Sequence, residues 1–417
     1  MDKRFAYVRI SLIDERRQVM ESIQSIYKIG LGPSSSHTMA IEYICLDVLK
    51  KYPKKQYEVI LYGSLALTGK GHFTDIVIEK TLRNVTINFD HQTHVEHPNT
   101  MDVVVLEKGE EIDCLRYESV GGGAFRLVGE EISQVDCYPH HSFEEIKAYC
   151  TEHGYSLSDY VKMHENESLL PHLRYVWQVM QETIETGLEK NGVLPGQLRV
   201  KRKAKSLYDY VVKVEDKEET DFKELMSYAY ATSEQNASGA RVVTSPTCGA
   251  SGVVPAVLYF LKRKYHLSDD TVFDALMVGG LIGSIIRHNA SISGAVAGCQ
   301  AEIGSACSMA AAARGSIFHH PLDTIEYAAE MAMEHHLGLT CDPILGYVQI
   351  PCIERNAMAA IRAIDASRLS YMLPNSQSVS FDTVIQTMYQ TGKDLTSSYK
   401  ETSLGGLATF YRQKEKG

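Results

Sequence analysis

The alternation of apolar and polar positions predicts two structurally different parts in this chain. In the first part, short runs rich in β-branched and aromatic residues, separated by polar or glycine-containing turns, are typical of strands. A helical spacing of apolar residues also begins near Ser34 and continues through Ile41, Cys45 and Val48. The charged, amphipathic pattern of residues 8–27 predicts a helix. The predicted strands are Val59–Tyr62, Val85–Phe89, Met101–Leu106, Leu115–Val120 and Ala124–Val128.

From Ser142 onward the apolar residues recur at helical spacing, and after residue 220 almost nothing has the pattern of a strand. The helical segments are rich in Ala, Met, Leu and Gly, as closely packed helices require. We therefore predict an α+β protein of two domains, because a chain of 417 residues exceeds the comfortable size of one core. A mixed α/β domain is expected over residues 1–155 and an all-α catalytic domain over residues 156–417.

The composition narrows the class of protein. Hydrophobic residues make up 44% and charged residues 23%, which is ordinary for a soluble globular protein. The formal net charge of -10 and the lack of a long basic run argue against nucleic acid as a partner. The beginning of the chain lacks the apolar core of a secretory signal, and the most apolar stretch, residues 275–286, is too short to span a bilayer. We expect a cytoplasmic protein with reduced thiols.

Three cysteines stand out by their neighbours. Cys299, Cys341 and Cys352 lie among Gly, Asn, Gln, Asp and Arg, whereas a cysteine that only fills a core usually has aliphatic neighbours. None of them forms a Cys-x-x-Cys pair, so their spacing alone leaves a metal site and a structural role equally open. Cys307 fits a small buried residue of a helix, and Cys248 would line a pocket at best. The remaining cysteines, Cys45, Cys114, Cys137 and Cys150, have a structural pattern.

The run Ser34-Ser-Ser-His-Thr38 can be read in two ways. Serine and threonine routinely cap helices, which would explain the run by itself. Three consecutive hydroxyls exceed what capping needs, and a helix start that offers N–H groups and hydroxyls can bind the carboxylate of a substrate. His72, at another predicted helix start, is on local grounds more typical of a cap or a surface residue than of a catalyst.

Several motifs resemble, in the same order, the iron-sulfur-dependent L-serine dehydratases of bacteria. The resemblance covers nearly the whole chain. It rests on Gly32-Pro-Ser-Ser-Ser-His-Thr38, Tyr62-Gly-Ser-Leu-Ala-Leu-Thr-Gly-Lys-Gly-His72, Asn289-Ala-Ser-Ile-Ser-Gly-Ala295, Gly298-Cys-Gln-Ala-Glu-Ile-Gly304, Met333-Glu-His-His-Leu-Gly-Leu-Thr-Cys-Asp-Pro343, Val348-Gln-Ile-Pro-Cys-Ile-Glu-Arg-Asn-Ala357 and Tyr399-Lys-Glu-Thr-Ser403.

The resemblance implies a cofactor and a reaction. Cys299, Cys341 and Cys352 would bind a [4Fe-4S] cluster and leave one iron free to meet L-serine, which loses water and becomes pyruvate and ammonia. A base must take the α-proton, for which His72 is the first candidate and His37 the second. The residues expected to contact the substrate or the cluster are Ser34, Ser35, Ser36, Thr38, Asn289, Ser291, Ser293 and Arg355.

The chain also departs from the family pattern. Phe73 stands where many relatives carry a second histidine, so no role of that imidazole transfers. Some relatives end in a cysteine that can occupy the free iron, whereas this sequence ends in Lys-Glu-Lys-Gly417. We therefore expect an iron position that is open to water and a cluster that oxygen damages more easily. A homodimer and slow turnover of L-threonine are further expectations.

Two other functions compete with this interpretation. A pyridoxal-phosphate deaminase performs the same net reaction, but no phosphate-binding partner for Lys70 is visible in the sequence. A serine sensor or assembly protein could use the same scaffold without turnover. The colour of the purified protein distinguishes a pyridoxal-phosphate enzyme from an iron-sulfur enzyme. A pyruvate assay after anaerobic reconstitution distinguishes a sensor from an active enzyme.

Overall fold

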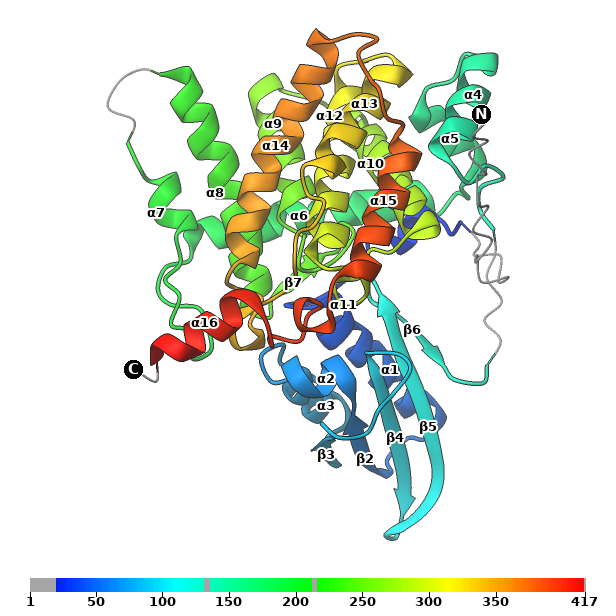
Figure 1. Cartoon of the computed structure of the whole chain (residues 1–417), viewed down its shortest axis with the longest axis vertical. Coiled ribbons are helices and arrows are strands. Elements are labelled where there is room, and N and C mark those ends of the chain that lie inside the picture. Colours follow the sequence, from blue (N-terminus) through cyan, green and yellow to red (C-terminus); the bar gives the residue numbers. More distant parts are fainter. Residues whose placement is uncertain (1–19, 131–135, 212–215, 416–417) are drawn as a thin grey trace, which may run out of the picture.

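The computed structural model describes residues 20–130, 136–211 and 216–415, and it consists of a part that contains the main sheet and a larger helical part (Figure 1). The helix that the sequence predicts over residues 8–27 falls mostly outside the described residues. Within the described end of that range, Ile23–Ser25 form one 3-10 turn, η1. The fold is α+β, as predicted.

The main sheet has five strands in the order β3-β2-β4-β5-β6. β2 pairs in parallel with β3, and the other neighbours are antiparallel. All five predicted strands are confirmed. In β2 every second side chain is buried, which is the period that places one face of a strand against a core. The strands are Gln56–Leu61 (β2), Val85–Phe89 (β3), Thr100–Glu107 (β4), Glu110–Gly121 (β5) and Ala124–Leu127 (β6).

Three helices accompany this sheet: Ala40–Lys51 (α1), Gly63–Thr68 (α2) and Thr74–Leu82 (α3). The apolar stripe of α1 that the sequence indicated, with Ile41, Cys45 and Val48, is buried together with sheet residues. A turn of π-helix, η2 (Ser35–Met39), leads directly into α1. The serine run therefore lies at the beginning of a long continuous helix, as its capping pattern predicted.

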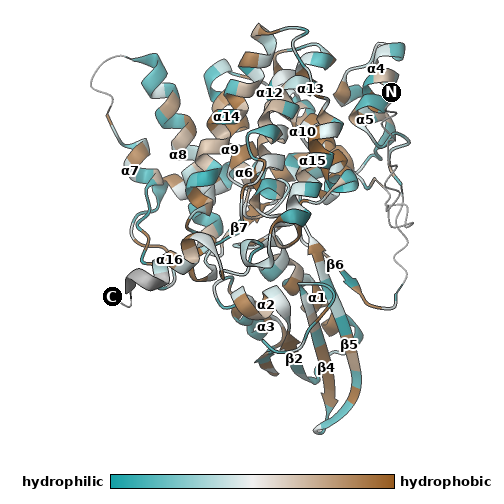
Figure 2. Cartoon of the chain, in the orientation of Figure 1, coloured by the Kyte–Doolittle hydropathy of each residue, from teal (hydrophilic) through white to brown (hydrophobic). Residues whose placement is uncertain are grey.

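The helical part is organised around α12 (Ser305–Ile317), of which all residues except Ser316 are buried. Its alanines and glycine let the helices α9, α10, α13 and α14 pack closely against it. Figure 2 shows apolar residues concentrated on these central helices. The helices of this part are Phe143–His153 (α4), Leu157–His164 (α5), Leu169–Glu189 (α6), Ala204–Tyr208 (α7), Lys217–Ala237 (α8), Val253–Tyr265 (α9), Asp269–Asn289 (α10), Gly294–Ala297 (α11), Ser305–Ile317 (α12), Leu322–Glu334 (α13), Cys352–Met372 (α14), Phe381–Asp394 (α15) and Gly406–Glu415 (α16).

A small second sheet joins the two parts. β1 (Ile29–Leu31) pairs antiparallel with β7 (Arg241–Val243). The sequence pattern gave almost no strand after residue 220, and β7 is too short to produce a period of its own. In the described part of the chain, no helix combines the length and the apolar character that crossing a membrane requires.

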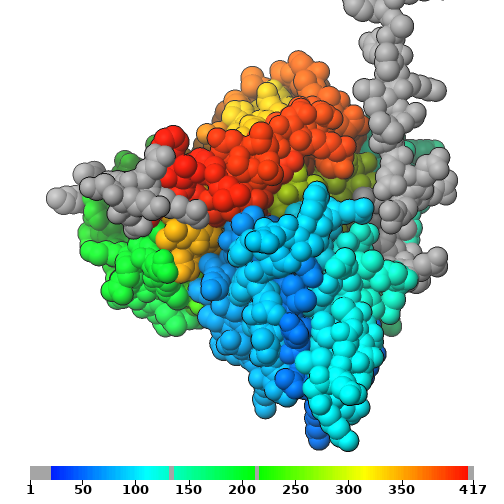
Figure 3. Space-filling view, turned by 60° about the horizontal axis from the view of Figure 1, so that its bottom comes forward, coloured from blue at the N-terminus to red at the C-terminus, as the bar shows by residue number. Residues whose placement is uncertain are grey.

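The C-terminal segment returns to the junction between the two parts. After α15 the chain forms a 3-10 turn, η5 (Ser397–Tyr399), and Lys400 then makes a parallel bridge with Cys341. The next residue, Glu401, accepts a hydrogen bond of 2.9 Å at its backbone carbonyl from the Ser64 hydroxyl of α2. Figure 3 shows this segment, in red, along the boundary between the blue sheet part and the helices. The segment thus contacts both parts where they meet.

Candidate active site

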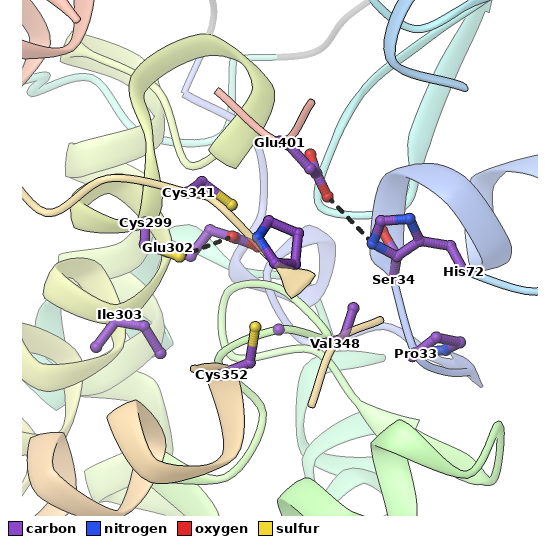
Figure 4. Close-up of a pocket in the computed structure, with 12 residues that line it drawn as sticks. Pro33, Ser34, His72, Cys299, Glu302, Ile303, Cys341, Val348, Cys352 and Glu401 are labelled. Atoms are coloured by element: carbon purple, nitrogen blue, oxygen red, sulfur yellow. Dashed lines mark hydrogen bonds and ion pairs between the residues drawn. The ribbon is translucent and has the colours of Figure 1, made fainter. Parts of the chain in front are cut away.

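One buried pocket at this junction collects residues from distant segments of the chain (Figure 4). Its thiols come from the helical part, its histidine from the sheet part and one carboxylate from the C-terminal segment. Residues from so many segments converge only when the whole chain is folded. The lining residues are Pro33, Ser34, His72, Gly249, Cys299, Glu302, Ile303, Cys341, Pro343, Val348, Cys352 and Glu401.

The three cysteines that the sequence singled out all line this pocket. Cys299 precedes a π-helical turn, η3 (Gln300–Gly304), Cys341 lies in the loop after α13, and Cys352 is the first residue of α14. Each is buried, with at most 8% of its surface exposed. The thiol sulfurs of Cys299 and Cys341 and a carboxylate oxygen of Glu302 lie within 4.8 Å of one another, close enough to hold a metal ion. The structure therefore contains a cysteine group that could bind a metal.

The pKa values of the three thiols indicate that a positive charge is missing among them. A hydrogen bond from the Cys341 thiol and the charge of Arg355 lower the pKa of Cys299. The pKa of Cys341 is raised well above its ordinary value, first by its role as that donor and then by burial. Burial and the Cys299 charge do the same for Cys352. A bound cation would remove this opposition, because metal binding requires and stabilises deprotonated thiols.

Glu302 is held against the thiols by two glycines. One of its carboxylate oxygens accepts a 2.7 Å hydrogen bond from the Thr247 hydroxyl, and the other lies 4.0 Å from the Cys299 sulfur. A Cβ atom at Gly294 would lie 2.7 Å from this carboxylate, and one at Gly249 would lie 3.0 Å from it. Burial raises the pKa of Glu302 to about 7. Glu302 was not predicted from the sequence, although it stands three positions after Cys299.

His72 presents a free lone pair to the pocket. Its Nδ1 atom lies 3.0 Å from the carbonyl oxygen of Thr68, which can only accept, so Nδ1 carries the proton and Nε2 is bare. Nε2 is buried and has no hydrogen-bond partner among the described residues. Burial lowers the pKa of His72 to about 4, so the ring is neutral at pH 7. A neutral ring with a bare Nε2 can accept a proton, as a general base must, although the low pKa makes it a weak acceptor until a charged group enters the pocket.

Both ring nitrogens of His37, the second candidate base, have hydrogen-bond partners. The Ser64 hydroxyl donates to the Glu401 carbonyl, so its oxygen accepts the proton of His37 Nε2 at 3.1 Å. Nδ1 of His37 then accepts from the Ser36 hydroxyl at 2.8 Å. The two imidazole rings lie 4.5 Å apart between centroids. The geometry favours His72 as the base and His37 as its support.

The hydroxyls of the serine run have different surroundings. Ser34 lines the pocket, and its oxygen accepts a hydrogen bond from the His37 backbone N–H, so it is also the cap that the sequence predicted. Ser36 holds His37, and the Thr38 hydroxyl donates to the His72 carbonyl at 2.7 Å. Ser35 is buried but is not part of the lining. The run therefore fixes both histidines, and only Ser34 faces the pocket.

The other predicted substrate contacts lie outside the lining. Asn289 is exposed at the end of α10, and its amide donates to the carbonyls of His141 and Ile285. The Ser291 oxygen accepts from the backbone N–H of Ser293. The substrate-binding role of these three stays a prediction. The Arg355 guanidinium interacts with Cys299 and donates to the Thr340 carbonyl at 2.6 Å, and its role toward the substrate also stays a prediction.

Glu401 is a second pocket residue that was not predicted from the sequence. Its Oε1 atom lies 3.7 Å from His72 Nε2 and 3.7 Å from His37 Nδ1. Its backbone N–H donates to the carbonyl of Cys341 at 2.8 Å, so the residue links the thiols to the histidines. The signal was present, because Glu401 belongs to one of the motifs that resemble the family. Its distance in sequence from the cysteines and histidines hid its contribution.

Cys307 has the buried environment expected for it, whereas Cys248 lies outside the lining of the pocket. Cys307 is fully buried in α12, and its thiol donates to the carbonyl of Ala359 at 3.3 Å. Cys248 is fully buried beside Met39 and Val242 and is not part of the lining, although the next residue, Gly249, is.

The fold and the pocket define an α+β protein with a buried site of thiols, imidazole and carboxylates that can bind a metal. Residues 74–408 match the family described as "Serine dehydratase alpha chain", and residues 22–88 match the "Serine dehydratase beta chain". The chain therefore belongs to the serine dehydratase family.

Individual relatives agree with this assignment over nearly their whole length. The chain is 40% identical to L-serine dehydratase 2 of Escherichia coli K12, covering 93% of this chain and 98% of the relative. It is 40% identical to the L-serine dehydratase of Haemophilus influenzae, with coverages of 93% and 99%. The L-serine dehydratase of Helicobacter pylori 26695 is 38% identical, with coverages of 93% and 98%.

Proposed function

We propose that this chain is an L-serine dehydratase, a carbon-oxygen lyase that converts L-serine to pyruvate and ammonia. One observation carries the proposal: three thiols and the bare Nε2 atom of His72 line the same buried pocket. Elimination of water from serine needs a group that accepts the departing hydroxyl and a base that takes the α-proton. The names and full-length similarity of the relatives support the same reaction.

We further propose that Cys299, Cys341 and Cys352 bind a [4Fe-4S] cluster. The donor set fits, because thiolate is the ligand that iron-sulfur clusters take from proteins and three thiols leave one iron without a protein sulfur. Arg355 adds a positive charge beside the sulfurs. When bound, the cluster would supply a Lewis-acidic iron for the departing hydroxyl group.

The residues of the chain would bind and deprotonate the substrate. Ser34 offers a hydroxyl at the beginning of a helix, where a carboxylate is favoured. His72 Nε2 takes the α-proton while hydroxide leaves the β-carbon, which gives aminoacrylate. Aminoacrylate rearranges to the imine, and water then releases ammonia and pyruvate. His37, held by Ser36 and Ser64, keeps the His72 side of the pocket in place.

The competing pyridoxal-phosphate mechanism gains no support from the pocket. Lys70, the lysine considered for it, lies over the Phe89 ring and is not part of the lining. A homodimer, a cytoplasmic location, slow turnover of L-threonine and the division into residues 1–155 and 156–417 stay predictions. Residues before position 155, such as Tyr27 and Phe143, also contribute to the core of the helical part.

Anaerobic reconstitution tests the proposed function. Protein loaded with iron and sulfide without air should contain about four irons per chain, show a visible absorption that dithionite bleaches, and form pyruvate from L-serine. Serine binding without pyruvate would indicate the sensor instead. An absorption band that hydroxylamine abolishes would indicate pyridoxal phosphate.

A further inference from the structure

An amino-acid substrate brings three polar groups into a site, and the proposed function accounts for two of them. The carboxylate has Ser34 and the start of a helix, and the hydroxyl has the metal. An ammonium group that leaves water for a buried pocket needs an acceptor of its own, and a carboxylate is the strongest one that a protein offers. The lining contains two carboxylates, Glu302 and Glu401.

Glu302 is already engaged. The Thr247 hydroxyl donates to one of its oxygens, and the other faces the Cys299 thiol, between Gly249 and Gly294. The Glu401 carboxylate points toward His72 (Figure 4). Among the described residues, its carboxylate has ion-pair distances only to His37 and His72. Both rings are held neutral by burial, which lowers their pKa values. Within residues 20–130, 136–211 and 216–415, Glu401 therefore has no cationic partner.

The position of Glu401 relative to the base fits an α-ammonium group. Its Oε1 atom lies 3.7 Å from His72 Nε2, the atom that would accept the α-proton. In an amino acid the α-hydrogen and the nitrogen are attached to the same carbon. A substrate whose α-hydrogen points at Nε2 can thus direct its ammonium to Oε1 without a second change of position.

The backbone of Glu401 is held in a strained conformation. Its φ angle of +57° lies in the left-handed region, which residues other than Gly, Asn and Asp rarely adopt. Hydrogen bonds at both ends hold it there, because its N–H donates to the Cys341 carbonyl and its own carbonyl accepts from Ser64. Strained backbone that is held on both sides is typical of functional sites.

We propose that the Glu401 carboxylate binds the α-ammonium group of the substrate and thereby selects amino acids over other short carboxylic acids. This inference rests on the proposed function. It makes Glu401 a substrate-binding residue that acts beside His72.

The test compares two inhibitors that lack the leaving hydroxyl, L-alanine and propionate, which differ by the ammonium group. Loaded wild-type enzyme should bind L-alanine more tightly than propionate in competition with L-serine. In Glu401→Gln, which keeps the size of the side chain, this preference should fall about 10- to 100-fold, and KM for L-serine should rise by a similar factor. Glu401→Asp, which keeps the charge, should retain part of the preference.

Glu302→Gln is the matched control, because it removes the other carboxylate of the same pocket and should keep the preference for L-alanine. Iron content and circular dichroism of each variant establish that it is folded and loaded. If Glu401→Gln keeps the preference, or Glu302→Gln loses it equally, the inference is wrong while the proposed function stands. Wild-type enzyme that forms no pyruvate would overturn the proposed function, and this inference with it.

Discussion

The thiol wall of the pocket consists of Cys299, Cys341 and Cys352, and its histidine wall consists of His72 with His37 behind it. The two walls are held in different ways. Among the residues that the structure describes, every ring nitrogen of His37 and His72 except His72 Nε2 has a hydrogen-bond partner, supplied by Ser36, Ser64 and Thr68. The thiol wall has few such partners, and the pKa values of Cys341 and Cys352 are raised well above normal. The histidine wall is therefore preorganised by the chain alone, whereas the thiol wall needs a bound cation to become fully deprotonated.

Removal of a thiol should have the largest effect. Cys299→Ala, Cys341→Ala or Cys352→Ala should lower iron and sulfide content and reduce pyruvate formation by at least ~10⁴-fold, because the hydroxyl would lose its Lewis acid. Metal analysis and a pyruvate assay, both without air, measure the two effects. Cys307→Ala is the control, since Cys307 is buried in α12 away from the lining. A full iron load in any of the three variants would remove that cysteine from the ligand set.

Removal of the base should lower activity without affecting iron binding, which distinguishes the role of the histidine wall from that of the thiol wall. His72→Gln should lower kcat about 10³-fold while iron content stays at the wild-type level, because only proton transfer is lost. His37→Gln should cost about 10-fold, since His37 supports the pocket and its two nitrogens are already occupied. Steady-state kinetics on loaded protein measures both. A larger loss in His37→Gln than in His72→Gln would exchange their roles.

The buried histidines should make the metal-free protein sensitive to acid. Burial lowers the pKa values of His72 and His336 to about 4, below the ordinary value near 6.5 of the unfolded chain. The unfolded chain thus binds more protons between these values, and stability is lost as the pH falls through this window. From pH 7 to pH 5 the free energy of unfolding should decrease by about 2 kcal/mol for each histidine.

Urea unfolding of the metal-free protein at the two pH values measures this loss. His72→Gln should have a weaker dependence on pH than the wild type, since glutamine does not titrate. An unchanged dependence would show that His72 is not held neutral by the fold.

The smallest expected effect is at Ser64. Ser64→Ala removes the acceptor of His37 Nε2 and the donor to the Glu401 carbonyl, which should cost about 1 to 2 kcal/mol of stability and several-fold in kcat. Ser284→Ala in α10 is a matched control, because its buried hydroxyl has no hydrogen-bond partner among the described residues. Equal losses in the two variants, measured by urea unfolding, would argue against the network.

The features that were predicted correctly from the sequence are those that depend on neighbouring residues. All five strands of the main sheet were found, because short runs with β-branched or aromatic residues stand between polar or glycine-containing turns, and the stripe of α1 was found from its spacing. The three cysteines were found because their neighbours are unlike those of a core. β7 was missed, since three residues have no period.

The missed features of the site depend on contacts between distant segments. Glu401 reaches the histidines only because Lys400 pairs with Cys341 and Ser64 binds the next carbonyl. The tautomers of His37 and His72 follow from their partners, which the sequence does not place. In the serine run, the sequence indicated both capping and substrate binding, and only the fold shows that Ser36 and Thr38 hold histidines.

The central claim is that the chain eliminates water from L-serine with a metal held by the thiol wall. Removal of iron from active protein with a chelator, without air, tests it most directly. Pyruvate formation should disappear with the iron and return when iron and sulfide are restored. Full activity in protein from which all iron has been removed would contradict the account.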